Sequence, residues 1–362
     1  MIGTGNLGII GHAGAGAIAA AGMHDGVGVI RAIAPKAELL RDPRLLGKLE
    51  APLARTMPAG LSMRVDRLGT RVLTVNIHMA VPGGVDLLAK NENISALRDV
   101  AQFVNSSDAD VVMVQELRNR SVHQATSGGG LSDVASTFAH LINARHMAFT
   151  PAITGEASGF SHYGTGIFTR NGYAIDHAVN VALPNSGVEE ARSAGIAAIS
   201  SPDGRKPLTV ISTHLASRPV EDQALRDSQL GVLADIVQSI TSTGGFSYRD
   251  ALSGQLQVAS GYSRRIVLGG DLNQAQHETD RILNTAGLTH VNDQLARQGV
   301  AQAARAATAD VITSVGPLGA HRIDHVYTSN AQVSDVAIAS VPGREYVGEP
   351  TDHKSLIADL VD

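Results

Sequence analysis

Residues 266–280 of the chain read IVLGGDLNQAQHETD. The apolar start of this stretch predicts a buried strand, and two glycines interrupt it just before Asp271 and Asn273. In an extended chain, side chains two residues apart point to the same side. We therefore expect a carboxylate and a carboxamide to lie together where the strand opens onto its loop.

Acid, amide or imidazole side chains also close the other strands that the sequence predicts. They are Asn76 and His78 in LTVNIH, Glu116 in VVMVQE, His214 in TVISTH, Asp324 and His325 in RIDHV, and Asp352 and His353 in EPTDHKSL. Each one alone is more simply explained as a turn former or loop hydrogen bonder; Asp324 is then a hydrogen-bonded core acid and His325 a structural residue. Strand ends at one edge of a helix-covered sheet bind ligands, however, and this set suits a hard metal and a phosphate.

Helical patterns alternate with β-branched runs from about Leu68 onward. Helices are expected over residues 91–107, 131–144, 221–240 and 278–286. Residues 241–262 separate a helix from a strand by more than an ordinary connection, which predicts a functional lid or a disordered insertion. We expect one domain over residues 67–362, preceded by a Gly/Ala-rich and helical extension over residues 1–66.

The composition limits the chemistry that the chain can carry. It has 362 residues, 43% of them hydrophobic, no cysteine and a formal net charge of −5. The absence of cysteine excludes disulfides, thiolate metal sites and cysteine nucleophiles, so a metal must be held by oxygen or imidazole. The negative charge weighs against tight nucleic-acid binding, but it is compatible with a nuclease that makes a few local phosphate contacts.

The sequence contains no stretch of about 18 uncharged apolar residues, so no transmembrane helix is expected. The apolar start MIGTGNLGIIGHAGAGAIAA lacks the positive region of a signal peptide. We expect a soluble protein, either cytoplasmic or secreted. The sequence does not predict its oligomeric state.

In their order along the chain, the motifs TVNIH, VVMVQE, ISTHLAS, GGDLNQA, RIDHVYTS and TDHKSLIADL resemble those of the endonuclease/exonuclease/phosphatase superfamily. This superfamily includes deoxyribonucleases, abasic-site endonucleases, neutral sphingomyelinases and inositol polyphosphate 5-phosphatases. The resemblance spans roughly Leu68 to the C-terminus, and the ordered series is far more specific than any single motif. It implies an α/β fold, a four-layered α/β/β/α sandwich of two mixed sheets flanked by helices, and divalent-metal-dependent hydrolysis of phosphoesters.

The resemblance also implies a metal site and a water-activating site. Glu116 is expected to be the main metal-binding carboxylate, with Asn76 beside it and Asp352 near the metal. Mg²⁺ suits so sparse a ligand set because it keeps several waters, with Mn²⁺ or Ca²⁺ as alternatives. Asp271 is expected to orient or deprotonate the attacking water, and Asn273 to donate a hydrogen bond to a phosphate oxygen.

Two imidazoles complete the catalytic set that the resemblance implies. Asp324 is expected to fix the tautomer of His353, whose protonated form then stabilises the pentacovalent phosphate. His214 is expected to be a second phosphate contact or a general acid.

Tyr163, Arg170 and His78 are candidate substrate contacts. Tyr163 and Arg170 lie in SHYGTGIFTR, which occupies the place of the family's small-residue strand, and a structural role is an equal alternative for both. His78 stands where some abasic endonucleases have a metal-binding acid, so a second acidic ligand is not implied there.

Three functions are compatible with these residues, in order of preference. The first is a metal-dependent phosphoesterase acting on a small or lipid-derived phosphate ester, favoured by the negative charge and an aromatic content of 3%. The second is a Mg²⁺-dependent endo- or exodeoxyribonuclease of the same fold, although aromatic and basic DNA-gripping loops are not recognisable. The third is a catalytically inactive binding protein, disfavoured because the central catalytic-type residues are present.

Overall fold

The stretch 266–280 forms a strand and a helix joined by a short loop. In a computed structural model of the chain, β11 (Ile266–Asp271) is buried along its whole length, and α7 (Gln276–Leu283) begins after the loop that carries Asn273. The structure describes residues 28–30, 69–78, 94–119, 134–154, 162–187, 190–202, 206–217, 223–298, 314–316, 319–321, 323–339 and 353–361.

β11 lies inside a six-stranded sheet with the order β12-β15-β11-β8-β7-β6. The other members are β6 (Ala174–Ala182), β7 (Ser193–Ser200), β8 (Leu208–His214), β12 (Thr289–His290) and β15 (Asp324–Ser329). β11 and β8 are parallel, and the other neighbours are antiparallel. The carboxyl ends of β8 and β11 therefore lie beside the amino ends of β7 and β15.

The second sheet has seven strands in the order β1-β4-β5-β3-β2-β17-β16. They are β1 (Gly28–Ile30), β2 (Thr70–Asn76), β3 (Val111–Asn119), β4 (His146–Thr154), β5 (His162–Thr169), β16 (Gln332–Ala339) and β17 (Ser355–Val361). β2 and β3 are parallel, and the other neighbours are antiparallel. Asn76 and Glu116 thus lie toward the carboxyl ends of two adjacent parallel strands.

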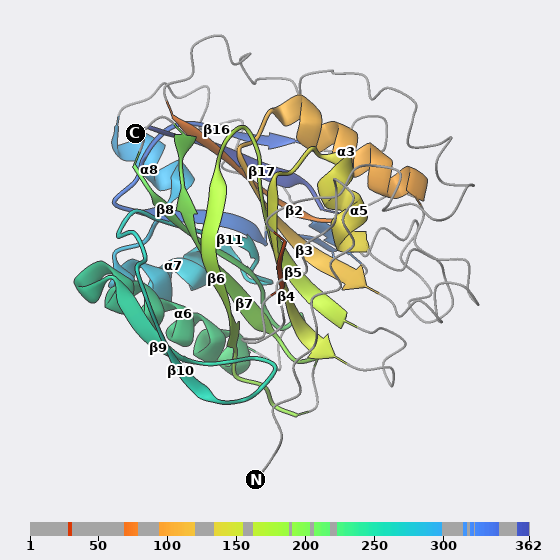
Figure 1. The fold of residues 1–362 in the computed structure, drawn as a ribbon. Helices are drawn as coiled ribbons and strands as arrows, with labels where there is room; N and C mark the ends of the chain where they lie inside the picture. The colour runs from red at the N-terminus through yellow and green to blue at the C-terminus, as the bar shows by residue number, and fades with distance from the viewer. Residues whose placement is uncertain are drawn as a thin grey trace.

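Helices cover the outer faces of both sheets (Figure 1). They are α3 (Ile94–Ser107) and α5 (Val134–Leu141) on the seven-stranded sheet, and α6 (Gln223–Thr243) with α7 on the six-stranded sheet. Phe103 and Phe138 belong to the first helix-covered core, and Leu233 and Leu268 to the second. A third core, which includes Met113, lies between the sheets. The expected four-layered α/β/β/α sandwich of two mixed sheets is confirmed.

The alternation of side chains along β3 explains why its first four residues, Val111–Val114, are all apolar. Val112 and Val114 belong to the core beneath the helices, whereas Val111 and Met113 belong to the core between the sheets. Successive side chains of a strand point to opposite faces, so a strand covered on both faces needs apolar residues throughout.

The predicted helices correspond to α3, α5, α6 and α7, the last continued by a 3-10 turn, η4 (Asn284–Ala286). The expectation of a loop over residues 241–262 is wrong. α6 ends only at Thr243, and β9 (Gly245–Arg249) pairs with β10 (Leu256–Ser260) in an antiparallel hairpin. Phe246 and Tyr248 are buried against the α6 core, which gives this segment its order.

Several shorter elements are not predicted by the sequence patterns. They are α8 (Val291–Arg297), β13 (Ser314–Gly316), β14 (Gly319–His321) and β1, which lies within the expected N-terminal extension and pairs with β4. The rest of residues 1–66 lies outside the described residues, so the domain boundary at residue 67 stays a prediction. Within the described ranges, no helix is both long and apolar enough to cross a membrane.

A Cβ atom would meet different obstacles at the two glycines of β11, Gly269 and Gly270. Gly270 has a φ of +150°, and a Cβ there would lie 1.9 Å from the backbone oxygen of Thr213 in β8. A Cβ on Gly269 would lie 2.6 Å from the terminal methyl group of Met113. The first clash is with rigid backbone and the second with the end of a flexible side chain, so position 270 has the stronger requirement for glycine.

Gly270→Ala is expected to lower the free energy of unfolding by about 2–3 kcal/mol, because β11 must move away from β8 and adopt an unfavourable φ. The matched variant Gly269→Ala is expected to cost about 1 kcal/mol, since Met113 can turn aside. Urea unfolding of the full chain, followed by circular dichroism, measures both. Equal losses would contradict the backbone clash.

Candidate active site

Strand register alone brings three of the expected residues together. Asp271, the last residue of β11, is paired with His214 of β8 on one side and with Asp324 of β15 on the other. His214 Nε2 lies 3.5 Å from Asp271 Oδ2. His353, which precedes β17, has its Nε2 3.6 Å from the same oxygen. Side chains from both sheets therefore converge on the Asp271 carboxyl group.

Glu116 reaches this point through an irregularity in β3. The pairing of β3 with β5 shifts between Val114 and Leu117, and Glu116 has a φ of +59°. The bulge leaves the Glu116 side chain half-buried in an otherwise buried strand. A left-handed backbone costs a residue such as glutamate about 1–3 kcal/mol, and strain of this kind accumulates at functional sites. The outlier therefore points to a functional role for the carboxylate.

The side chain of Asn76 joins the two sheets at the site. Its Nδ2 donates to Glu116 Oε1 at 3.1 Å and to Asp271 Oδ2 at 3.2 Å, while its Oδ1 accepts the backbone N–H of His78 at 2.9 Å. An amide side chain binds a hard cation through its oxygen atom, and the amide oxygen of Asn76 is turned toward the backbone N–H of His78. This geometry does not support Asn76 as a metal ligand; it holds two carboxyl groups side by side.

His78 follows β2 at the same end of the sheet, with a φ of +46°. It is half-buried, as Glu116 is. Its contact with a substrate stays a prediction.

Burial changes the chemistry of Asp271, which is only 2% exposed. Desolvation raises its pKa to about 7; the charge of His353 opposes this rise, and the charge of Asp324 adds to it. The backbone N–H of Asn273 donates to Asp271 Oδ1 at 3.0 Å, which favours the ionised form. A carboxyl group that titrates near neutral pH is well suited to take a proton from water.

The expected contact between His353 and Asp324 is present. His353 Nδ1 lies 2.8 Å from Asp324 Oδ2, and Asp324 is buried. An ionised carboxylate only accepts hydrogen bonds, so the proton in this bond is on Nδ1 and Nε2 is directed at Asp271. Asp352 lies outside the described residues, and its place near the metal stays a prediction.

Asn273 departs from the extended geometry that its spacing from Asp271 suggests. Its φ of +50° is left-handed, and its Nδ2 donates to the backbone oxygen of Leu215 at 3.0 Å. Asparagine adopts this conformation more readily than most residues. The side chain thus ties the loop after β11 to the end of β8, and its role as a phosphate donor stays a prediction.

Arg192 belongs to the cluster, although the pattern of strand ends does not predict it. It precedes β7 and is 6% exposed. Its Nη1 lies 3.1 Å from His214 Nδ1, and its Nη2 lies 3.2 Å from Glu190 Oε2. The sequence pattern consists of polar residues at the ends of strands, so it does not include a residue that precedes a strand such as β7. Because β7 is antiparallel to β8, it brings its amino end, and with it Arg192, to the site. A charged residue just before an apolar strand is the signal that could have found it.

Burial and charge set the protonation of the two side chains beside Arg192. Desolvation lowers the pKa of His214 well below its usual value, and the charge of Arg192 lowers it further. Desolvation also raises the pKa of Tyr163 well above its usual value, with a further contribution from Glu116. Tyr163, which hydrogen-bonds with Arg192, is therefore a neutral phenol. Its contact with a substrate stays a prediction.

Arg170 lies at the far end of β5 from Tyr163, and the structural alternative is correct for it. Its guanidinium group donates to the backbone oxygens of Val104 at 3.1 Å and Ala109 at 3.2 Å, and to Asn105 Oδ1 at 3.0 Å. These bonds tie the end of α3 to the sheet. Arg170 is buried there, so the expectation of a substrate contact is wrong.

His325 is also structural, as its simpler interpretation predicts. Its Nε2 donates to the backbone oxygen of Gln274 at 2.9 Å, and its Nδ1 lies 3.3 Å from His290 Nε2. Both imidazoles are fully buried. Since Gln274 belongs to the loop after Asp271, the pair of imidazoles holds this loop in place.

Among the described residues, one cluster of three side chains and the separate carboxylate of Glu116 offer ligands to a divalent cation. Asp271, Asp324 and His353 have ligand atoms within 4.8 Å of one another, but Asp324 and His353 already bond to each other. Glu116 is half-buried, which leaves room for the waters that Mg²⁺ retains. All of these groups are oxygen or imidazole donors, so the cluster fits a hard cation, and Glu116 fits hydrated Mg²⁺ better than the buried group does.

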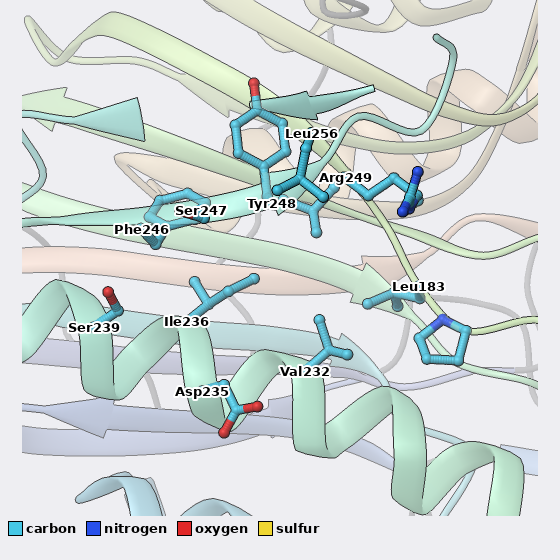
Figure 2. Close-up of a pocket in the computed structure, with 13 residues that line it drawn as sticks. Leu183, Val232, Asp235, Ile236, Ser239, Phe246, Ser247, Tyr248, Arg249 and Leu256 are labelled. Atoms are coloured by element: carbon cyan, nitrogen blue, oxygen red, sulfur yellow. The ribbon is translucent and has the colours of Figure 1, made fainter. Parts of the chain in front are cut away.

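A groove of about 590 Å³ lies between α6 and the β9–β10 hairpin (Figure 2). Its walls include Leu183, Ile236, Phe246 and Leu256, and it is lined by none of the expected site residues. The hairpin that replaces the expected loop therefore lines this groove and not the cluster around Asp271.

A family model described as the endonuclease/exonuclease/phosphatase family matches residues 73–353. The chain belongs to the endonuclease/exonuclease/phosphatase family. The matched range begins in β2 and ends at His353, so it contains all the expected site residues. The resemblance carried by the ordered motifs is confirmed, and membership makes the chain a metal-dependent phosphoesterase in the broad sense that includes nucleases.

Solved structures share this fold at low sequence identity. TDP2 from C. elegans is 19% identical with a TM-score of 0.54, over 83% of this chain and 78% of that chain. The human Nocturnin catalytic domain with bound sulfate is 16% identical with a TM-score of 0.55, over 84% and 98%. D. rerio TDP2 complexed with single-strand DNA product is 16% identical with a TM-score of 0.51, over 80% and 98%. These likenesses establish the fold alone. A search of curated proteins finds no match.

Arg170→Met is expected to lower the free energy of unfolding by about 2–3 kcal/mol, because buried carbonyl oxygens lose a charged donor. Turnover per folded molecule is expected to stay within about twofold of wild type, since Arg170 is bonded at the α3 end of the sheet. Urea unfolding and phosphodiesterase assays check the two statements. A large loss of turnover in stably folded protein would restore Arg170 to the site.

Proposed function

We propose that this enzyme hydrolyses a phosphoester with Mg²⁺, using Asp271 to orient and deprotonate the attacking water. The observation that supports this most directly is the state of the Asp271 carboxyl group. It is buried, its pKa is raised to about 7, it faces two imidazoles, and Asn76 links it to Glu116.

Glu116 is the residue proposed to hold the ion, because it is a half-buried carboxylate on a bulge beside Asp271. A bound Mg²⁺ supplies charge neutralisation on the phosphate and on the departing oxygen. Asn76 donates to both the Glu116 and the Asp271 carboxyl groups and so fixes the spacing between them. Mn²⁺ or Ca²⁺ would meet the same donors.

Asp271 is proposed to accept the proton of the water as its oxygen attacks phosphorus, while the bond to the ester oxygen breaks. His353, held through Nδ1 by Asp324, places Nε2 next to the same carboxyl group. In its protonated form it would donate to the phosphate oxygens, whose negative charge grows in the transition state. Asn273 and His214 are proposed as neutral donors to the same oxygens.

The substrate is proposed to be a small or lipid-derived phosphoester. A net charge of −5 disfavours the long-range attraction and counterion release that sustain binding to duplex DNA. A single small phosphate group requires only the few donors gathered around Asp271.

A nuclease activity is the second candidate, because one solved structure with this fold is D. rerio TDP2 complexed with single-strand DNA product. Binding to a single strand depends less on counterion release than binding to a duplex, so a net charge of −5 opposes it less. This alternative therefore concerns single-stranded ends more than intact duplexes.

Glu116→Gln is expected to reduce Mg²⁺-dependent turnover by about a hundredfold or more, since metal stabilisation of transition-state charge amounts to several kcal/mol. Calorimetric titration with Mn²⁺ is expected to show weakened binding, while the unfolding midpoint stays near wild type. Asp176→Asn is the matched control, because Asp176 is exposed and lies at the end of β6 that is paired with Ser200, away from the site. Turnover unchanged in Glu116→Gln would show that the metal site is misassigned.

A substrate panel separates the candidate functions. Full-chain protein with Mg²⁺, and with EDTA as control, is expected to hydrolyse bis(p-nitrophenyl) phosphate or a phosphodiester lipid in vesicles. It is expected to leave supercoiled plasmid intact across a salt series, because the acidic chain gains little from phosphate contacts. Cleavage of a single-stranded oligonucleotide in preference to both small esters would favour the nuclease. Equal inertness of wild type and Asp271→Ala on every ester would favour a binding protein.

A further inference from the structure

Arg192 is a buried charge beside His214 that the proposed reaction does not use. We propose that it is a positioning residue, which holds His214 in the tautomer with its proton on Nε2 so that this N–H is directed at the phosphate site beside Asp271. The proposal deepens the proposed function and rests on it only for its kinetic consequences.

The tautomer follows from which atoms can donate. Arg192 Nη1 lies 3.1 Å from His214 Nδ1. A guanidinium group has N–H donors and no acceptor, so the imidazole atom that faces it must accept. His214 Nδ1 therefore carries no proton, and the single proton of the neutral ring is on Nε2.

The opposite side of the ring is the side that matters for the reaction. His214 Nε2 lies 3.5 Å from Asp271 Oδ2, where the attacking water and a phosphate oxygen would meet. The other tautomer would present a lone pair there, which repels both the Asp271 carboxylate and the phosphate. Arg192 thus selects His214 as a neutral hydrogen-bond donor, so His214 is the phosphate contact and not the general acid.

The surroundings of Arg192 fix its guanidinium group. Nη2 pairs with Glu190 Oε2 at 3.2 Å, and Tyr163 hydrogen-bonds with Arg192. The backbone oxygen of Arg192 accepts the backbone N–H of Leu183 at 3.0 Å, which fixes the main chain that carries the side chain. β7 and β8 are antiparallel with Ala194 opposite Thr213, so Arg192 lies next to the end of β8.

Arg192 acts through His214 because a substrate cannot reach it. Its side chain is 5% exposed. The void beside it, lined by Tyr163, Thr165, Ser193 and His214, has a volume of about 10 Å³. That space holds one water at most and excludes a phosphate group.

Three substitutions of Arg192 test whether its hydrogen-bond donor or its positive charge fixes the tautomer of His214. Arg192→Met removes both, Arg192→Gln keeps a neutral N–H donor, and Arg192→Lys keeps a charged donor without the planar fork. Arg170→Met is the matched control, since it removes a second buried arginine whose bonds are made to the end of α3. All are studied as full-chain protein below their unfolding temperatures.

The deciding measurement is the ¹⁵N–¹H imidazole spectrum of His214, assigned with His214→Gln. Wild type, Arg192→Gln and Arg170→Met are expected to show a protonated Nε2 and a bare Nδ1. Arg192→Met is expected to show a shift toward the Nδ1–H form or a mixture of the two. Nδ1 protonated in wild type, or a spectrum unchanged in Arg192→Met, would overturn the proposal. This readout needs no turnover, so it stands even if the proposed function fails.

Kinetics on bis(p-nitrophenyl) phosphate with Mg²⁺ give the second test. Arg192→Met is expected to lower kcat by about 10–100-fold, as loss of a residue that orients a catalytic histidine does, with KM changed by less than about threefold. Arg192→Gln and Arg192→Lys are expected to recover most of this loss. The double variant Arg192→Met with His214→Ala should be no slower than His214→Ala alone. Additive losses would show that Arg192 does not act through His214 and would overturn the proposal.

Discussion

The amide of Asn76 is the contact on which the site depends. Its two N–H groups bond to Glu116 from β3 and to Asp271 from β11, and these strands belong to different sheets. Two carboxyl groups so close together repel each other when both are ionised, and Glu116 is one cause of the raised pKa of Asp271. Donation from one amide to both reduces this repulsion and fixes the spacing between the metal side and the water side of the site.

The sequence identifies most of the architecture because two periodicities are clear in it. The first four residues of β3, VVMV, are apolar because the strand is covered on both faces there, and the long helices have an apolar face. The β9–β10 hairpin within residues 241–262 is missed because its order comes from the packing of Phe246 and Tyr248 on α6, and no local sequence pattern records a contact between two segments. Short strands such as β12, with two residues, carry too little pattern to be recognised.

The sequence predicts which residues belong to the site more accurately than it predicts how their side chains are oriented. Asp271, His214, Asp324 and His353 come together as expected because each lies at a strand end on the same side of the molecule. Asn273 differs since a left-handed backbone turns it toward Leu215, and Asn76 differs since its oxygen is taken by a backbone N–H. The spacing of residues along the chain predicts neither of these two orientations.

The left-handed backbone at Glu116 has a consequence for any attempt to make this protein more heat-resistant. Glycine adopts a φ of +59° at no steric cost, so a library screened only for melting temperature should enrich glycine at position 116. The same substitution deletes the carboxylate. At this position, a substitution that raises thermostability therefore lowers turnover. Selection for function keeps the chain below the stability that its fold could reach.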